Sequence, residues 1–433
     1  MTIKTPHQLL VDVLGELGDE PSPSPAEAEK RAARERLGVL QDRLREMPGP
    51  SSEERAGLLV EVGDLRERGI HDHAAAMAAW EEAMRLGSVD AVERIAAVRE
   101  SDEEGGFDAI PLRRRVVAAD PGRIGSLRAM HRTFLALGAE SEAAAIASVL
   151  STFDSSFGGA VAPPPEAIRE PPDGALAAIR PGGFDGVARV LGLIWEGAYT
   201  LLRKELSDFG AAPATRLSPL EDSPLARAFL FASRMLGLPK ASVFVRPDRG
   251  AFIEVVATHP PCVIVGAGFQ AETARARFVL GRAIEGTSGG LVLGLSTAPE
   301  EIDVLIQAVR IALGGTPGLA TPRAMDLAPR LAKAMPPRVE RALKDETLRT
   351  PLPDDARTWS TLVRKAANRA GLLVSGDAAA CLRTLALEIP ELDGVDVGTA
   401  LGFQEAAARS AEFGDLVAFA VSEEYLALRW RSR

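Results

Sequence analysis

The sequence predicts an α+β protein that is mostly helical, in which helical repeats precede a helix-rich domain with a small β-sheet. Ala and Leu are abundant and β-branched residues are fewer, which favours helix. Paired helical segments recur within 51–157 at a period of about 34 residues, the signature of a helical repeat. Three short strand-like runs occur together, at 242–247, 251–257 and 262–267. These observations predict the fold class.

Composition and charge exclude several classes of protein. The chain has 433 residues and a net charge of −10, so it is long enough for two or three domains, and we expect no nucleic-acid partner. Its two cysteines, Cys262 and Cys381, do not form a disulfide framework. No apolar run approaches the ~20 residues of a membrane-spanning helix, and no secretion signal is recognisable. We therefore expect a cytoplasmic protein without membrane insertion.

Shifts in composition divide the chain into four segments. Residues 1–50 are expected to hold N-terminal helices and a flexible break, "GDEPSPSP". Residues 51–157 carry the helical repeats. Residues 158–185 are rich in Pro, Gly and Ala and are expected to form a linker. Residues 186–433 form the second domain.

The repeat segment shows two helical hairpins with the same layout. The stretch "LLVEVGDLRERGIHDHAAAMAAWEEAMRLG" (58–87) predicts two amphipathic helices joined by a short turn, and 126–150 repeats this pattern. The period and the paired helices resemble tetratricopeptide repeats. The sequence matches the tetratricopeptide consensus only in part. Trp80 lies in the second helix of the first hairpin, and the copy between the two hairpins carries an acidic insertion. The resemblance implies a surface that binds partner proteins.

The second domain begins with helices and continues with the strands. A helix is expected over 186–207, and Ser223 followed by Pro224 predicts the start of another. After the strand-like runs comes a helix over 271–285. Five or six further helices are expected from about residue 299 onward.

The stretch "VIVGAGFQA" (263–271) raises the question of a nucleotide site. A strand followed by Gly-x-Gly-x-x-Ala, from Gly266 to Ala271, is typical of a dinucleotide-binding turn. That site also needs an acid at the end of a following strand, whereas Glu285 has the right distance but lies in a predicted helix. We therefore expect that Gly266 and Gly268 serve backbone geometry, with a positive φ at one of them. A nucleotide-dependent enzyme using this turn stays open as an alternative.

A second resemblance accounts for the same region. The order of elements in 235–286, short strands and a glycine turn before a helix, resembles the heat-shock and CAAX-processing type zinc endopeptidases. The stretch "LVRKAANRAGLL" (362–373) resembles the later helix of that family, which provides a glutamate ligand. The likeness spans roughly 222–390. It implies a His-Glu-x-x-His motif on the helix 271–285.

The chemical groups of that family are missing from this sequence. The positions of the first His, the Glu and the second His hold Arg282, Ala283 and Gly286. Zinc hydrolysis needs the two His ligands and the general base, and a guanidinium places a positive charge where the cation would lie. The resemblance thus implies a pseudo-peptidase without metal or cofactor. The positions near the third ligand hold Arg364, Ala366, Ala367 and Asn368.

Other candidate groups are better explained by structure than by chemistry. His71 and His73 flank Asp72 in a predicted turn between two helices, where polar residues are common. Cys262 follows His259 across two prolines, and we interpret it as a buried cysteine at the start of a strand. Neither group is expected to form a catalytic or metal site.

The function that these patterns predict is non-catalytic. We expect a scaffold or adaptor that binds partner proteins through helical repeats and a pseudo-peptidase domain. The alternatives are an enzyme with unrecognised chemistry, such as a nucleotide-dependent one using the Gly266–Ala271 turn, and a regulatory subunit of a larger assembly.

Overall fold

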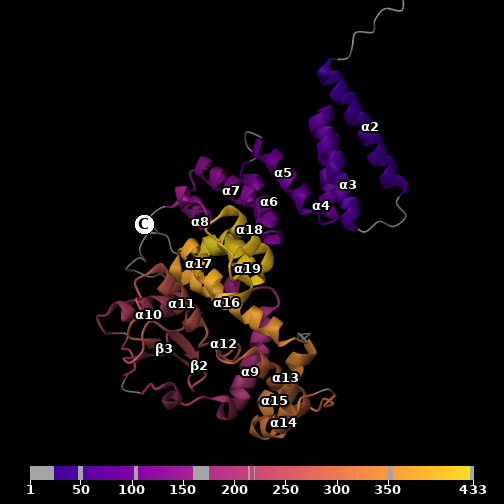
Figure 1. Ribbon diagram of the computed structural model, residues 1–433. Coiled ribbons are helices and arrows are strands. Elements are labelled where there is room, and N and C mark those ends of the chain that lie inside the picture. Colours follow the sequence, from indigo (N-terminus) through magenta and orange to yellow (C-terminus); the bar gives the residue numbers. More distant parts are fainter. Residues whose placement is uncertain are drawn as a thin grey trace, which may run out of the picture. The chain divides into compact units, whose positions relative to one another are not determined.

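The computed structural model confirms the predicted fold class. It is 71% helical, with 19 α-helices and one three-stranded sheet among the residues it describes (Figure 1). Predictions for 1–23, for 47–51 and for most of the expected linker, 159–174, lie outside the described residues. The structure describes residues 24–46, 52–101, 106–158, 175–212, 215–218, 220–318, 320–349 and 355–429.

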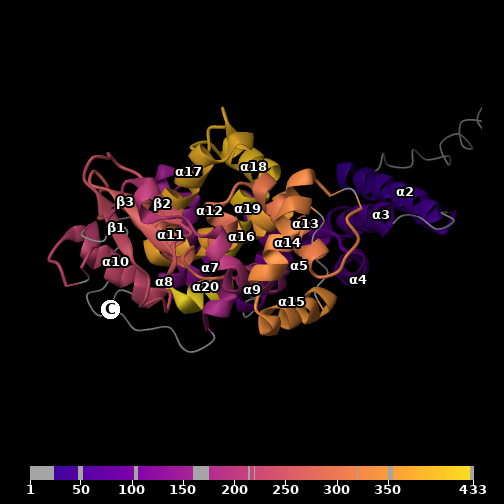
Figure 2. The ribbon, with the colours of Figure 1, turned by 90° about the horizontal axis from the view of Figure 1, so that it is seen from below.

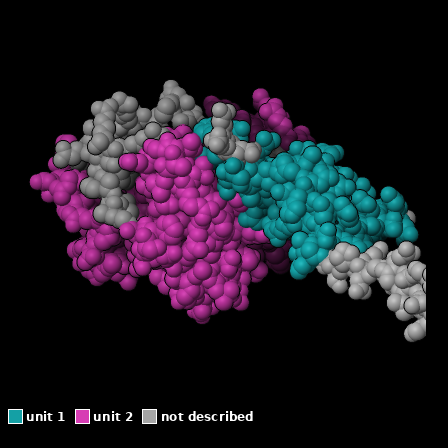
Figure 3. Space-filling view, turned by 90° about the horizontal axis from the view of Figure 1, so that it is seen from above, with its two compact units in different colours: residues 1–112 teal, residues 113–433 magenta. Residues whose placement is uncertain are grey.

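The chain forms two compact units, which are coloured separately in Figure 3. Unit 1 comprises residues 1–112 and unit 2 comprises residues 113–433. This division differs from the predicted one, in which the repeats end at residue 157 and a linker over 158–185 follows.

Unit 1 is a set of helices packed around a tryptophan. Trp80 is 2% exposed, and it lies in a core formed by α3, α4 and α5. A second small core joins α2 to α3 and α4. The helices are α2 (Pro25–Glu46), α3 (Ser52–Leu65), α4 (His73–Arg85) and α5 (Val89–Ser101), with the π-helical turn η1 (Arg66–Ile70) and the start of α6 (Gly106–Ala119).

Helix starts follow the expected repeat spacing through both units. The odd-numbered helices α3, α5 and α7 begin at residues 52, 89 and 124. The even-numbered helices α4, α6 and α8 begin at residues 73, 106 and 140. Both series lie close to the predicted period of about 34 residues.

The hairpin of α7 (Ile124–Ala136) and α8 (Glu140–Leu150) belongs to unit 2 because its polar groups are bonded to C-terminal helices. The Ser148 hydroxyl donates to Asp377 at 3.3 Å. The Arg383 guanidinium donates to the Thr152 carbonyl oxygen at 3.0 Å. Contacts across more than 200 residues of sequence cannot be anticipated from a linker-like composition, which explains the difference in boundary.

The sheet has the order β1-β3-β2 and mixes two directions. Strand β3 (Cys262–Gly266) is central and buried throughout. It pairs in parallel with β1 (Val243–Arg246) and antiparallel with β2 (Ile253–Val256). The three predicted strands are therefore confirmed, and of the two strand pairs only β2–β3 is antiparallel. Helices α11 and α12 pack against the sheet (Figure 2).

A large apolar core in unit 2 is formed by α9 and α12–α16. Among the described residues, eight α-helices lie from residue 299 onward, more than the five or six expected, because Ser410 and Ser422 cap new helices within continuous helical sequence. The helices are α9 (Phe184–Leu202), α10 (Pro224–Met235), α11 (Ala274–Glu285), α12 (Val292–Ser296), α13 (Pro299–Ala312), α14 (Pro322–Ala334), α15 (Pro337–Arg349), α16 (Ala356–Ser375), α17 (Ala378–Glu388), α18 (Ala400–Arg409), α19 (Ala411–Ala420) and α20 (Glu423–Leu428).

Short 3₁₀ segments connect several of these helices. They are η2 (Ser155–Phe157), η3 (Ala175–Ile179), η4 (Leu206–Phe209) and η6 (Pro390–Leu392).

None of the described helices combines the length and the apolar character that crossing a membrane requires.

Candidate functional site

The glycine turn after β3 is shaped by a neighbouring stretch of backbone. A Cβ atom at Gly266 would lie 1.9 Å from the Gly250 carbonyl oxygen, and one at Gly268 would lie 3.0 Å from the Gly250 carbonyl carbon. Neither glycine has a positive φ. The expectation of a left-handed residue is therefore wrong. Glycine is required here because the β1–β2 connection approaches too closely for a side chain.

The surroundings of this turn differ from a dinucleotide site. Helix α11 begins at Ala274, with the Thr273 side chain as its cap, and no described strand follows it. The strand–helix–strand unit of a dinucleotide fold is thus not formed by the described residues.

A cavity of about 730 Å³ adjoins the turn. Its charged lining residues are Arg216, Glu221 and Glu272. The Arg216 guanidinium already donates to the Ser242 hydroxyl at 3.0 Å. Two carboxylates against one engaged guanidinium do not favour a phosphate group.

The three positions of the expected metal motif lie on the last turns of α11, where each takes part in packing. Arg282 forms an ion pair with Glu388, and its guanidinium lies over the Phe278 ring, 5.2 Å from the centroid. Ala283 is 5% exposed. A Cβ atom at Gly286 would lie 2.8 Å from Leu295 Cδ1 and would also crowd a strand β2 side chain. No side chain, and hence no imidazole, fits at that position without rearrangement.

The expected third-ligand region lies on α16. The Arg364 guanidinium donates to Glu412 at 2.7 Å, so it is held by α19. Ala366 and Ala367 are each 1% exposed. Asn368 is also 1% exposed, and neither atom of its amide has a hydrogen-bond partner among the described residues. An unpaired buried amide costs free energy, about 1–3 kcal/mol, so Asn368 is an unusual feature of this helix.

Helices α11 and α16 run antiparallel and approach closely through glycine. A Cβ atom at Gly371 would lie 2.6 Å from both the Phe278 ring and the Phe278 carbonyl oxygen. The Ser375 hydroxyl donates to the Ala274 carbonyl oxygen at 2.9 Å.

Glu285 is a buried titratable group at the end of α11. The residue is 7% exposed. Burial raises the pKa of the carboxyl to about 7, and the positive charge of Arg180 opposes this shift only in part. In the sequence, Glu285 was notable only for its distance from the glycine turn. It lies two turns beyond Phe278 and one turn beyond Arg282 on the same helix face, which is the local signal of its burial.

The other candidate groups have structural roles. Asp72 caps α4 by accepting from the Ala75 amide at 3.1 Å. The His259 ring stacks on Tyr199 with centroids 3.9 Å apart. Cys262 and Cys381 are buried, and desolvation raises the pKa of both thiols.

Over the part of the chain that the structure describes, no three or more His, Cys, Asp or Glu side chains are grouped so that they could hold a metal ion. Comparison with known proteins found no matching family model, no matching curated protein and no matching solved structure.

Proposed function

We propose that this protein is a non-catalytic scaffold that docks partner proteins through its repeat-like helical hairpins and through a degenerate peptidase-like unit. One observation supports the proposal above others. The positions where the resemblance places the zinc ligands and the general base hold Arg282, Ala283 and Gly286, and each position is used for packing or ion pairing. A helix of this kind stabilises a fold and presents surfaces, but it has no group to activate water.

Three measurements on the full-length protein test the proposal. Elemental analysis should find no stoichiometric zinc, and a chelator should leave the melting temperature unchanged. Hydrolysis of unfolded casein should equal the buffer rate with or without added Zn²⁺. Affinity capture followed by size-exclusion chromatography should yield a complex of defined stoichiometry. About one zinc per chain together with zinc-dependent hydrolysis would overturn the proposal.

The nucleotide-dependent alternative has a separate test. The Gly250 carbonyl oxygen lies against Gly266, and carboxylates line the adjoining cavity, so we expect no nucleotide site there. NAD, NADP, FAD or ATP at millimolar concentration should leave the melting temperature unchanged, whereas a ligand of the native state would raise it. Saturable stabilisation by any of the four, lost in Gly268→Ala, would favour the enzyme.

A further inference from the structure

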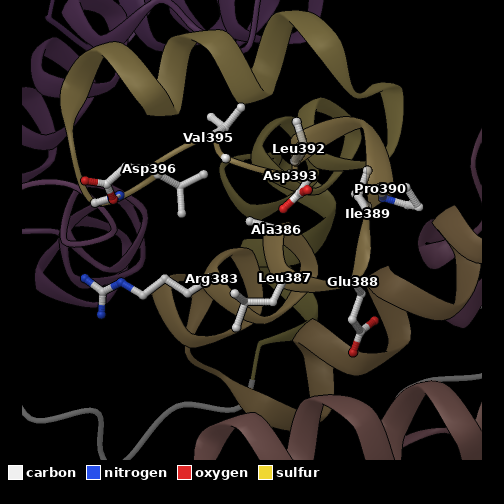
Figure 4. A pocket seen from close by; sticks show the side chains of 13 residues that line it. Arg383, Ala386, Leu387, Glu388, Ile389, Pro390, Leu392, Asp393, Val395 and Asp396 are labelled. Atoms are coloured by element: carbon white, nitrogen blue, oxygen red, sulfur yellow. Dashed lines mark hydrogen bonds between the residues drawn. The ribbon is translucent and has the colours of Figure 1, made fainter.

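A groove of about 650 Å³ lies between the C-terminal half of α17 and the segment that leads to α18 (Figure 4). It lies in unit 2, apart from the contact between α11 and α16. Its apolar lining includes Leu387, which is 77% exposed. A single exposed leucine is common, but here it belongs to a continuous apolar lining, which indicates a binding surface. The other apolar residues of this lining are Ala386, Ile389, Pro390, Leu392, Val395 and Val397.

The charge of this groove is negative. Glu388, Asp393 and Asp396 line it, and Glu391 lies in the same segment. The Asp396 carboxylate accepts only from a backbone amide, Gly398, among the described groups, so its charge is not neutralised. Glu388 is the one acid of this set with an ion-pair partner among the described residues.

Among the described residues that line the groove, Arg383 is the one basic side chain, and it is directed elsewhere. Arg383 donates to the carbonyl oxygens of Ser151 and Thr152. In Figure 4 its side chain extends away from Leu387 and Asp393. The groove therefore combines an exposed apolar side chain with two carboxylates that have no cationic partner among the described residues.

We propose that this groove binds a cationic apolar peptide segment of a partner protein, with an apolar side chain against Leu387 and a lysine or arginine beside Asp393 and Asp396. The inference rests on the proposed scaffold function and names the chemistry of the partner. Opposite charges across an interface favour association and select the partner. An acidic surface repels nucleic acid and anionic membranes, which leaves a basic segment of protein as the complementary occupant.

The test measures binding of a fluorescein-labelled peptide of four leucines and four lysines to the full-length protein by fluorescence anisotropy. Leu387→Ser and Asp393→Lys should each weaken binding by about tenfold or more, because one removes apolar contact and the other places like charges together. Leu348→Ser and Asp326→Lys are matched controls, since Leu348 is 86% exposed and Asp326 is exposed, and both lie outside this groove. They should change affinity less than twofold. Circular dichroism checks that every variant is folded.

Two altered peptides separate the contribution of charge from that of apolar contact. Replacing the four lysines by glutamate, or the four leucines by serine, should abolish binding. Binding should weaken as salt is raised from low to physiological concentration. Equal binding of the lysine and glutamate peptides, or equal affinity of the groove variants and the controls, would overturn the proposal. Self-association that Leu387→Ser abolishes, in the absence of peptide binding, would overturn it in favour of a second copy.

The outcome can be distinguished from failure of the scaffold function. A captured partner that binds the Leu387→Ser/Asp393→Lys double variant as tightly as the wild type shows that the groove assignment is wrong while the scaffold proposal stands. Zinc-dependent hydrolysis removes the scaffold proposal itself.

Discussion

The helix pair α3–α4 of unit 1 and the pair α11–α16 of unit 2 both depend on glycine, yet they bury different chemistry beside it. In α3–α4 the glycine is Gly63, whose missing side chain makes room for the Trp80 indole. The rest of that contact combines an apolar core with the Arg55–Glu82 ion pair, and Trp80 Nε1 is buried without a hydrogen-bond partner among the described residues. In α11–α16 the glycines Gly281 and Gly371 bring two backbones together. Glu285 of α11 and Asn368 of α16 are buried as well.

Both contacts bury polar atoms, but of different kinds. The α3–α4 contact leaves an indole N–H unpaired, and its ion pair is partly exposed. Burying Glu285 and Asn368 costs free energy that apolar residues in their places would not lose. A buried carboxyl fits the proposed degenerate catalytic unit, and the described residues of α3 and α4 bury none. Three substitutions test this difference between the two contacts.

The largest effect is expected for Gly371→Ala. The new methyl group would lie 2.6 Å from the Phe278 carbonyl oxygen, and backbone cannot rotate out of the way as a side chain can. We expect the free energy of unfolding of unit 2 to fall by about 3 kcal/mol. Urea unfolding of the full chain measures the size of this fall in free energy, and hydrogen exchange should locate it in α11 and α16. Gly57→Ala in α3, where a Cβ meets nothing within 4 Å, is the control and should stabilise by about 0.5–1 kcal/mol. If the free energy of unfolding fell by less than it does for an ordinary surface substitution, α11 and α16 would be able to move apart without cost.

Glu285→Gln tests the buried carboxyl through pH. The pKa of Glu285 is raised from 4.5 to about 7 in the folded protein. Between these values the folded state holds a proton that the unfolded state has lost, so stability from this group falls as pH rises and is lowest above the folded pKa. The variant should therefore be more stable than the wild type at pH 8, by about 2–3 kcal/mol, and the gain should vanish near pH 4.5. Parallel stability curves from pH 4.5 to 8 would contradict a shifted carboxyl.

Gly63→Ala should have the smallest effect of the three. Its Cβ would lie 2.3 Å from Trp80 Nε1, but an indole ring can shift whereas a carbonyl of a helix cannot. We expect a loss of about 1–2 kcal/mol, confined to unit 1. Hydrogen exchange over residues 52–101 and tryptophan fluorescence measure this loss of stability. The Gly63→Ala/Trp80→Phe double variant should recover part of the loss, and complete additivity of the two changes would show that they do not interact.

Local sequence determined most of the secondary structure. The three strand-like runs form β1, β2 and β3 within one or two residues of their predicted ends. Ser223 and Asp377 cap helices because a short polar side chain can accept from an unpaired amide nearby in the chain. The even spacing of the paired helices also appears as predicted. These features depend on interactions between residues a few positions apart, which a single sequence displays directly.

Tertiary structure alone decided which of these elements meet. The glycines of "VIVGAGFQA" make room for the backbone at Gly250, and no pattern within the turn reveals that neighbour. Glu285 is buried by the packing around the end of α11, and the α7–α8 hairpin belongs with unit 2 because Ser148 of α8 is bonded to Asp377 at the start of α17. A carboxyl on an amphipathic helix and a glycine in a turn have several local explanations. The choice between them depends on register and distance between segments far apart in the chain, which only the folded structure specifies.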